Sequence, residues 1–124
     1  MFIEYNNNPL NKRTDDCVVR AIAKALNLDW RSVYTMLSAH GLKECDLFQK
    51  NYVWNDLLKT IGFERYGIVD TCPDCYTIRD FANDNKDGIY ILGTGEHVVT
   101  VENGNWFDTW DSGSAVPLVC FRRA

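Results

Sequence analysis

Apolar residues recur at three- and four-residue intervals through the first half of the chain. This spacing places them along one side of a helix. The pattern predicts three helices, over residues 17–26, 30–40 and 49–61, after a short apolar strand at residues 2–5. We expect Gly41 to end the second helix, because glycine readily adopts the left-handed conformation that closes a helix.

The second half of the chain changes from helical spacing to the patterns of strands. Short apolar or alternating runs are bounded by glycine, asparagine and aspartate, as in antiparallel sheets. Thr77 is expected to cap a brief helix at residues 78–82 before them. Helices followed by strands indicate an α+β fold, with N-terminal helices packed on a C-terminal antiparallel sheet. The expected strands cover residues 88–92, 96–101, 106–110 and 116–121.

Asn103 and Gly104 separate two of these strands and predict a two-residue hairpin turn. Both central residues of a type I′ turn need positive φ, which asparagine and glycine tolerate. In this register His97 and Asp108 share one face of the sheet as diagonal neighbours, and we expect that face to pack on the first helix. A loop one residue longer would bring Asp111 opposite His97 instead. The choice of carboxylate therefore depends on the register.

Cys17 stands at the expected start of the first helix. Unpaired backbone N–H groups and the helix dipole favour a thiolate there, whereas the neighbouring Asp15 and Asp16 would raise the thiol pKa. A cysteine followed by a strand histidine and an aspartate is the order of a nucleophile, its base and an orienting acid. The alternative is that Cys17 is a small buried core residue and that His97 is a hydrogen-bonded core histidine.

Length and charge limit the possible functions. The chain has 124 residues and a net charge of −4, which fits one domain over residues 1–124 and argues against nucleic-acid binding. No stretch approaches the roughly 20 apolar residues of a membrane span, and the N-terminus lacks the pattern of a secretion signal. We therefore expect a cytoplasmic protein that does not enter membranes, with five reduced cysteines.

Cys72 and Cys75 flank a Pro-Asp pair and suggest either a redox pair or half of a zinc site. The remaining zinc ligands would be Cys45 and His40, at irregular spacing, and His40 fits better as a residue that ends its helix. We favour a third interpretation, in which the segment is a turn and its two thiols have neither a redox nor a metal-binding role. We expect no metal and no organic cofactor.

Three segments carry a family resemblance: Asp16-Cys17, His97-Val98-Val99 and Phe107-Asp108-Thr109-Trp110. In their order and local setting the chain resembles the papain-like superfamily of cysteine peptidases. Within it, the chain is most similar to the compact bacterial and phage branch that includes bacteriocin-leader-processing peptidases.

This resemblance implies a papain-like fold and a cysteine peptidase that acts on a peptide or protein substrate. Cys17 would be the nucleophile, His97 the general base and Asp108 the orienting acid. Asn11, six residues before Cys17, would supply an amide to the oxyanion hole. Alternatives are a cell-wall amidase, a zinc-stabilised interaction domain, and a catalytically inactive module such as a phage accessory protein that binds a host protein.

Overall fold

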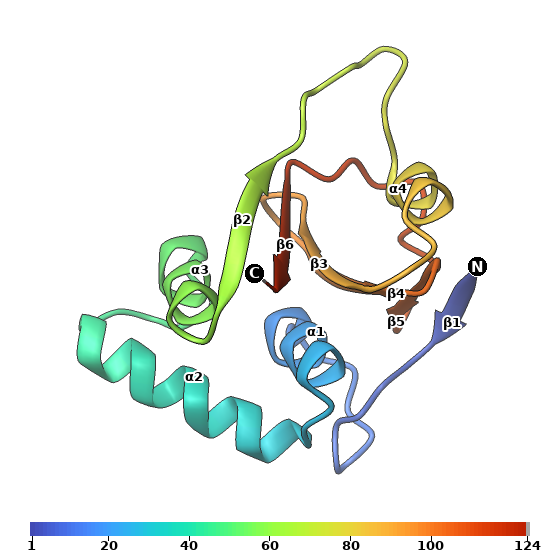
Figure 1. The fold of residues 1–124 in the computed structure, drawn as a ribbon. Coiled ribbons are helices and arrows are strands. Elements are labelled where there is room, and N and C mark those ends of the chain that lie inside the picture. The colour runs from blue at the N-terminus through green and yellow to red at the C-terminus, as the bar shows by residue number, and fades with distance from the viewer. Residues whose placement is uncertain (124) are drawn as a thin grey trace.

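The computed structural model describes residues 1–123 and shows an α+β fold (Figure 1). Over these residues it contains four helices and six strands. The helices are α1 (Cys17–Leu26), α2 (Trp30–Glu44), α3 (Asn51–Thr60) and α4 (Ile78–Asp84). The strands are β1 (Phe2–Glu4), β2 (Phe63–Gly67), β3 (Ile89–Gly93), β4 (Val98–Glu102), β5 (Asn105–Asp108) and β6 (Val119–Arg123).

The six strands form one mixed sheet in the order β1-β5-β4-β3-β6-β2. β1 pairs with β5 in parallel, and the other pairs are antiparallel. The expected sheet was therefore incomplete, because it lacked the N-terminal β1 and the mid-chain β2. β6 also returns between β3 and β2 instead of extending a simple meander. These pairings join segments far apart in the chain, which local patterns do not encode.

Helices cover both faces of the sheet (Figure 1). The first three helices and one face enclose the α1–α3 core, which includes Ile22, Leu37, Leu58 and Phe121. α4 and the opposite face enclose the α4 core. The buried residues of the α4 core are Ile78, Phe81, Ala82, Leu92, Val99, Val101, Trp106 and Cys120.

The Asn103-Gly104 hairpin has the predicted register. Asn103 and Gly104 have φ values of 51° and 80°, and Val101 pairs with Trp106. The prediction that the first helix covers this face was wrong, because Val101 and Trp106 lie in the α4 core. The opposite face of β4 meets α1, where the Thr100 hydroxyl donates to the backbone oxygen of Ala21 at 2.5 Å. Because β4 carries apolar residues on both faces, the sequence pattern did not show which helix would cover the hairpin face.

Gly41 does not end α2, contrary to the sequence prediction. The helix continues to Glu44 and is closed by Cys45 in the left-handed conformation, with φ of 56°. A Cβ atom at Gly41 would lie 2.8 Å from the backbone oxygen of Asp46. Glycine is therefore needed at this position so that the following loop can pack back against the helix.

The other helix ends follow the sequence more closely. α3 begins two residues later than expected and ends one residue earlier, whereas α4 extends two residues further. Thr77 caps α4 as predicted, and Asp80 completes a capping box by accepting from the Thr77 backbone.

Cys72 and Cys75 form a disulfide, so the expectation that all five cysteines are reduced was wrong for this pair. Cys17, Cys45 and Cys120 are free thiols. Within residues 1–123, none of the helices combines the length and apolar character that a membrane crossing requires.

Candidate active site

Cys17 is the first residue of α1, and its side chain is partly buried. Asp16 occupies the N-cap position but makes no side-chain capping bond. The N–H groups of the first helical turn have no acceptor within the helix, and the Asp16 side chain does not supply one. The thiol lies on the wall of a cleft of about 660 Å³, which side chains including Gln49, Glu96 and Trp110 also line.

His97 is held at the cleft by the turn between β3 and β4. Its backbone N–H donates to the Thr94 hydroxyl at 3.1 Å, and its carbonyl accepts from the Thr94 N–H at 2.9 Å. The ring nitrogen Nε2 lies 2.5 Å from Oδ2 of Asp108. The Trp110 ring packs against the imidazole with centroids 5.0 Å apart. Because Nε2 is engaged by Asp108, Nδ1 is the ring nitrogen left to interact with the Cys17 side chain, which lines the same cleft.

Asp108 is 1 % exposed, and donors reach both of its carboxylate oxygens. Oδ2 accepts from the Ser112 hydroxyl at 2.7 Å as well as from His97. Oδ1 accepts from Nη2 of Arg20 at 3.0 Å and from the Thr109 N–H at 2.8 Å. A buried carboxylate with several donors is stabilised in its charged form. Asp108 can thus orient His97 while remaining ionised.

Arg20 links this carboxylate to the start of α1. Its guanidinium is buried and also forms an ion pair with Asp16. The other oxygen of Asp16 accepts from Nε1 of Trp30 at 2.9 Å. One arginine thus lies between two buried carboxylates, so a protonated His97 supplies the second positive charge of the network.

The pKa values of the cleft residues follow from these contacts. Burial by itself would raise the pKa of Cys17, but hydrogen bonds from His97 and the Val98 backbone, with the His97 charge, lower it. Burial would lower the pKa of His97, whereas its contacts with Asp108 and Cys17 raise it to about 9. The arrangement therefore favours a thiolate beside an imidazolium.

The Asp108 carboxyl shows the complementary shift. Burial would raise its pKa, but the hydrogen bonds from His97 and Ser112 lower it below the ordinary value. The negative charge of Asp16 was expected to raise the pKa of Cys17. This effect does not dominate, because the Asp16 carboxylate is paired with Arg20.

The structure places Cys17 and His97 on the cleft wall, and the buried Asp108 contacts His97. Asp111 lies apart from His97: its carboxylate accepts from Nε1 of Trp106 at 2.8 Å and from the Gly113 N–H at 3.0 Å. Of the two carboxylates left open by the sequence, Asp108 is the one that contacts His97.

Asn11 is not among the residues that line the cleft. It is exposed, has a positive φ of 54°, and closes a turn in which its N–H donates to the Asn8 oxygen at 2.9 Å. Side-chain amides also bond within the loop, which curls it away from an extended path. The amide residues that the structure places on the cleft wall are Gln49 and Asn51, and Nδ2 of Asn51 already donates to the Gly95 oxygen at 3.2 Å.

Sequence reasoning missed the roles of Arg20 and Ser112. Arg20 is a charged residue among the apolar positions of α1. This interruption of the apolar pattern was the sequence signal that could have indicated a buried ion pair. Ser112 lies in a polar segment, Asp111-Ser112-Gly113, that is typical of a turn, and its burial depends on the path of the loop after β5. Asp111 instead holds the turn that follows β5, where its carboxylate accepts from the Gly113 N–H.

Comparisons with known proteins assign no family to this chain. No protein family model matches the chain, and no curated protein matches it. A comparison with solved structures also gives no match.

Proposed function

We propose that this protein is a papain-like cysteine hydrolase that cleaves peptide bonds or related amide bonds. Cys17 is the nucleophile, His97 exchanges protons with it and with the leaving amine, and Asp108 orients His97. The observation that carries the proposal is that Cys17 and His97 line one cleft and shift each other's pKa, while Nε2 of His97 lies 2.5 Å from Oδ2 of the buried Asp108. Cys17 from α1 and His97 from the β3–β4 turn line this cleft, and the buried Asp108 at the end of β5 contacts His97.

The proposed reaction begins with the thiolate form of Cys17. Its sulfur attacks the carbonyl carbon of the amide, and the carbonyl oxygen becomes negatively charged. When this intermediate collapses, the C–N bond breaks and protonated His97 gives its proton to the leaving amine. A thioester to Cys17 remains.

Water completes the cycle by hydrolysing the thioester. Neutral His97 takes a proton from the attacking water, the C–S bond breaks, and the carboxylic acid leaves. The resting thiolate and imidazolium are restored, so no metal or organic cofactor takes part in the proposed steps. Asp108 stabilises the imidazolium and keeps Nδ1 directed at Cys17.

The developing oxyanion needs donors that are already in place. The Cys17 N–H is suitable because it opens α1 and has no partner within the helix. The Gln49 amide also lines the cleft and is a second candidate donor.

The proposal is tested with a peptide library prepared by digesting a cell lysate and blocking all existing N-termini. The protein is added to this library, and new N-termini are identified by mass spectrometry. We expect a recurrent cleavage pattern with the natural chain and none with Cys17→Ser or His97→Ala. Cys45→Ser is the matched control, since Cys45 is an exposed free thiol that does not line the cleft, and it should retain the pattern.

A fluorescent peptidyl acyloxymethyl ketone provides a second readout on the same variants. This reagent alkylates activated cysteines in peptidase clefts, so labelling should depend on both Cys17 and His97. Absence of both cleavage and His97-dependent labelling would contradict the proposed hydrolase and would favour the alternative of an inactive binding module.

A further inference from the structure

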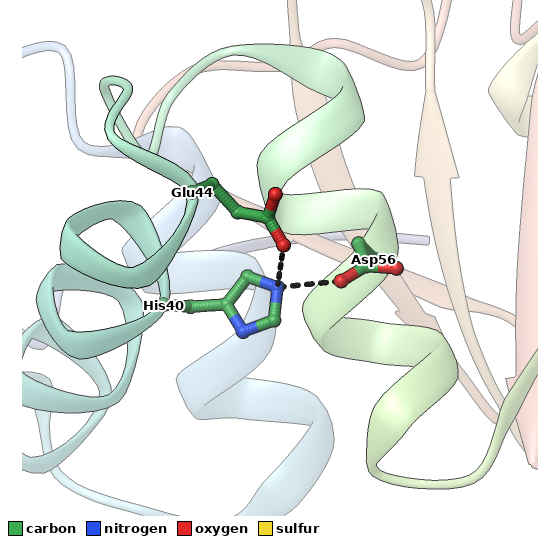
Figure 2. A group of neighbouring side chains, drawn as sticks. All are labelled: His40, Glu44 and Asp56. Carbon is green, nitrogen blue, oxygen red and sulfur yellow. Dashed lines mark hydrogen bonds and ion pairs between the residues drawn. The ribbon is translucent and has the colours of Figure 1, made fainter.

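A second cluster of polar side chains lies between α2 and α3, outside the cleft (Figure 2). His40 and Glu44 are one helical turn apart on α2, and Asp56 comes from α3. Nε2 of His40 lies 2.8 Å from Oδ2 of Asp56 and 3.8 Å from Oε1 of Glu44. Two carboxylates from different helices therefore converge on one ring nitrogen.

We propose that His40, Glu44 and Asp56 form a binding site for a divalent transition metal, with Zn²⁺ as the preferred ion. This inference is independent of the proposed hydrolase activity. One imidazole nitrogen and two carboxylate oxygens are a ligand set that Zn²⁺ accepts in proteins. The two carboxylates would also balance the charge of the ion.

The distances within the cluster are close to those of a metal site. Around a tetrahedral Zn²⁺, nitrogen and oxygen ligands at about 2.0–2.1 Å lie roughly 3.3 Å from one another. The two separations from His40 Nε2, 2.8 and 3.8 Å, fall on either side of that value, and the three ligand atoms lie within 4.8 Å of one another. Shifts of about half an ångström would bring each carboxylate oxygen to the required distance from His40 Nε2, and the exposed Asp56 side chain can also adjust its distance to Glu44.

Burial differs among the ligands in a way that suits binding. The His40 side chain is 7 % exposed and fixes one ligand, whereas Asp56 is 51 % exposed and free to adjust. Glu44 and Asp56 line a surface cavity of about 410 Å³, which has room for water ligands to complete the coordination. Lys59 and Arg65 line the same cavity, and their positive charges oppose the metal charge.

A metal at this position would tie the end of α2 to α3. The loop of residues 46–50 lies between these two helices and leads Gln49 to the cleft wall. The site would thus restrain the segment that supplies one wall of the proposed active site.

The test is titration of the metal-free protein with Zn²⁺, by calorimetry and by thermal unfolding, in a Cys17→Ser/Cys45→Ser background. Replacing both removes the two free thiols that are not buried, and the remaining free thiol, Cys120, is buried. We expect saturable binding of one ion per chain and a rise in Tm. Asp56→Asn and Glu44→Gln should each weaken binding more than about ten-fold, since even partners that only orient a metal ligand contribute 10–100-fold. Both positions are exposed, so these variants should fold.

Lys59→Gln is the matched control, and its effect on metal affinity should be opposite to that of the two carboxylate variants. It removes a positive charge from the same cavity without removing a ligand, and it should tighten binding. Titration with Co²⁺ should give a visible spectrum without a sulfur-to-metal charge-transfer band. Binding that is equally strong in Asp56→Asn and Glu44→Gln, or no saturable binding at millimolar Zn²⁺, would overturn the site and leave an ordinary ion pair between two helices.

Discussion

At the scale of single residues, reactivity at Cys17 depends on contacts more than on its helix position. Burial raises the thiol pKa, and the neighbouring His97 reverses that effect. Cys120 shows the result without such a partner, because burial raises its pKa to about 11. The same residue type is therefore suited to different roles at the two positions.

The pH dependence of alkylation tests this difference. In the natural chain, Cys17 should react with iodoacetamide at a half-maximal pH below the value of about 8.5 for an ordinary thiol. The thiolate–imidazolium pair should persist until His97 loses its proton near pH 9. In His97→Ala only burial remains as the main influence, so the midpoint should move to higher pH.

Mass spectrometry of each modified peptide measures these rates residue by residue. Cys45 is read in the same sample and is the internal control, because it is an exposed free thiol that does not line the cleft. Equal midpoints for Cys17 in the natural chain and in His97→Ala would refute the coupling between these residues.

At the scale of elements, Arg20 joins α1 to the end of β5. Its guanidinium contacts Asp16 at the helix start and Asp108 on the strand, with 6 % of its side chain exposed. Removing one member of a buried ion pair leaves the other charges without compensation. The position of α1, and with it of Cys17, is therefore coupled to the charge network of the cleft.

Replacing Arg20 by methionine should lower the free energy of unfolding by about 3–5 kcal/mol. Arg13→Met is the matched control, because Arg13 pairs with Glu4 on the surface, with exposures of 61 % and 64 %. That change should cost no more than about 1 kcal/mol. Urea unfolding measures both values, and a loss in Arg20→Met as small as that in Arg13→Met would contradict the role of the buried network.

At the scale of the whole molecule, two cores share one sheet. Leu58 belongs to the α1–α3 core and Leu92 to the α4 core, and each is fully buried. Because β3, β4 and β6 contribute residues to both cores, the loss of packing on one face should weaken the other. The expectation of a single domain over residues 1–124 stays a prediction, which unfolding can test.

Leu58→Ala and Leu92→Ala should each lower the free energy of unfolding by about 2–5 kcal/mol. Each variant should still unfold in one urea transition, with coincident curves from tryptophan fluorescence and far-UV circular dichroism, as expected for one cooperative unit. Separate transitions in either variant would show that the two faces unfold independently and would contradict the single-domain prediction.

Local patterns in the sequence determined much of what positions the site. Helical spacing marked the first three helices, and Asn103-Gly104 set the hairpin register because few residue pairs accept two positive φ angles. That register placed Asp108, rather than Asp111, near His97. The segments that carry the candidate triad were therefore visible in the chain itself.

Tertiary structure decided the remaining features, because each depends on contacts between segments distant in sequence. It paired β1 with β5, inserted β6 beside β3, and assigned the hairpin face to α4. It buried Arg20 between two carboxylates and brought His40 to Asp56 on the next helix. Periodicity indicates which side of an element is buried, whereas the partner that covers it is chosen by packing across the whole molecule.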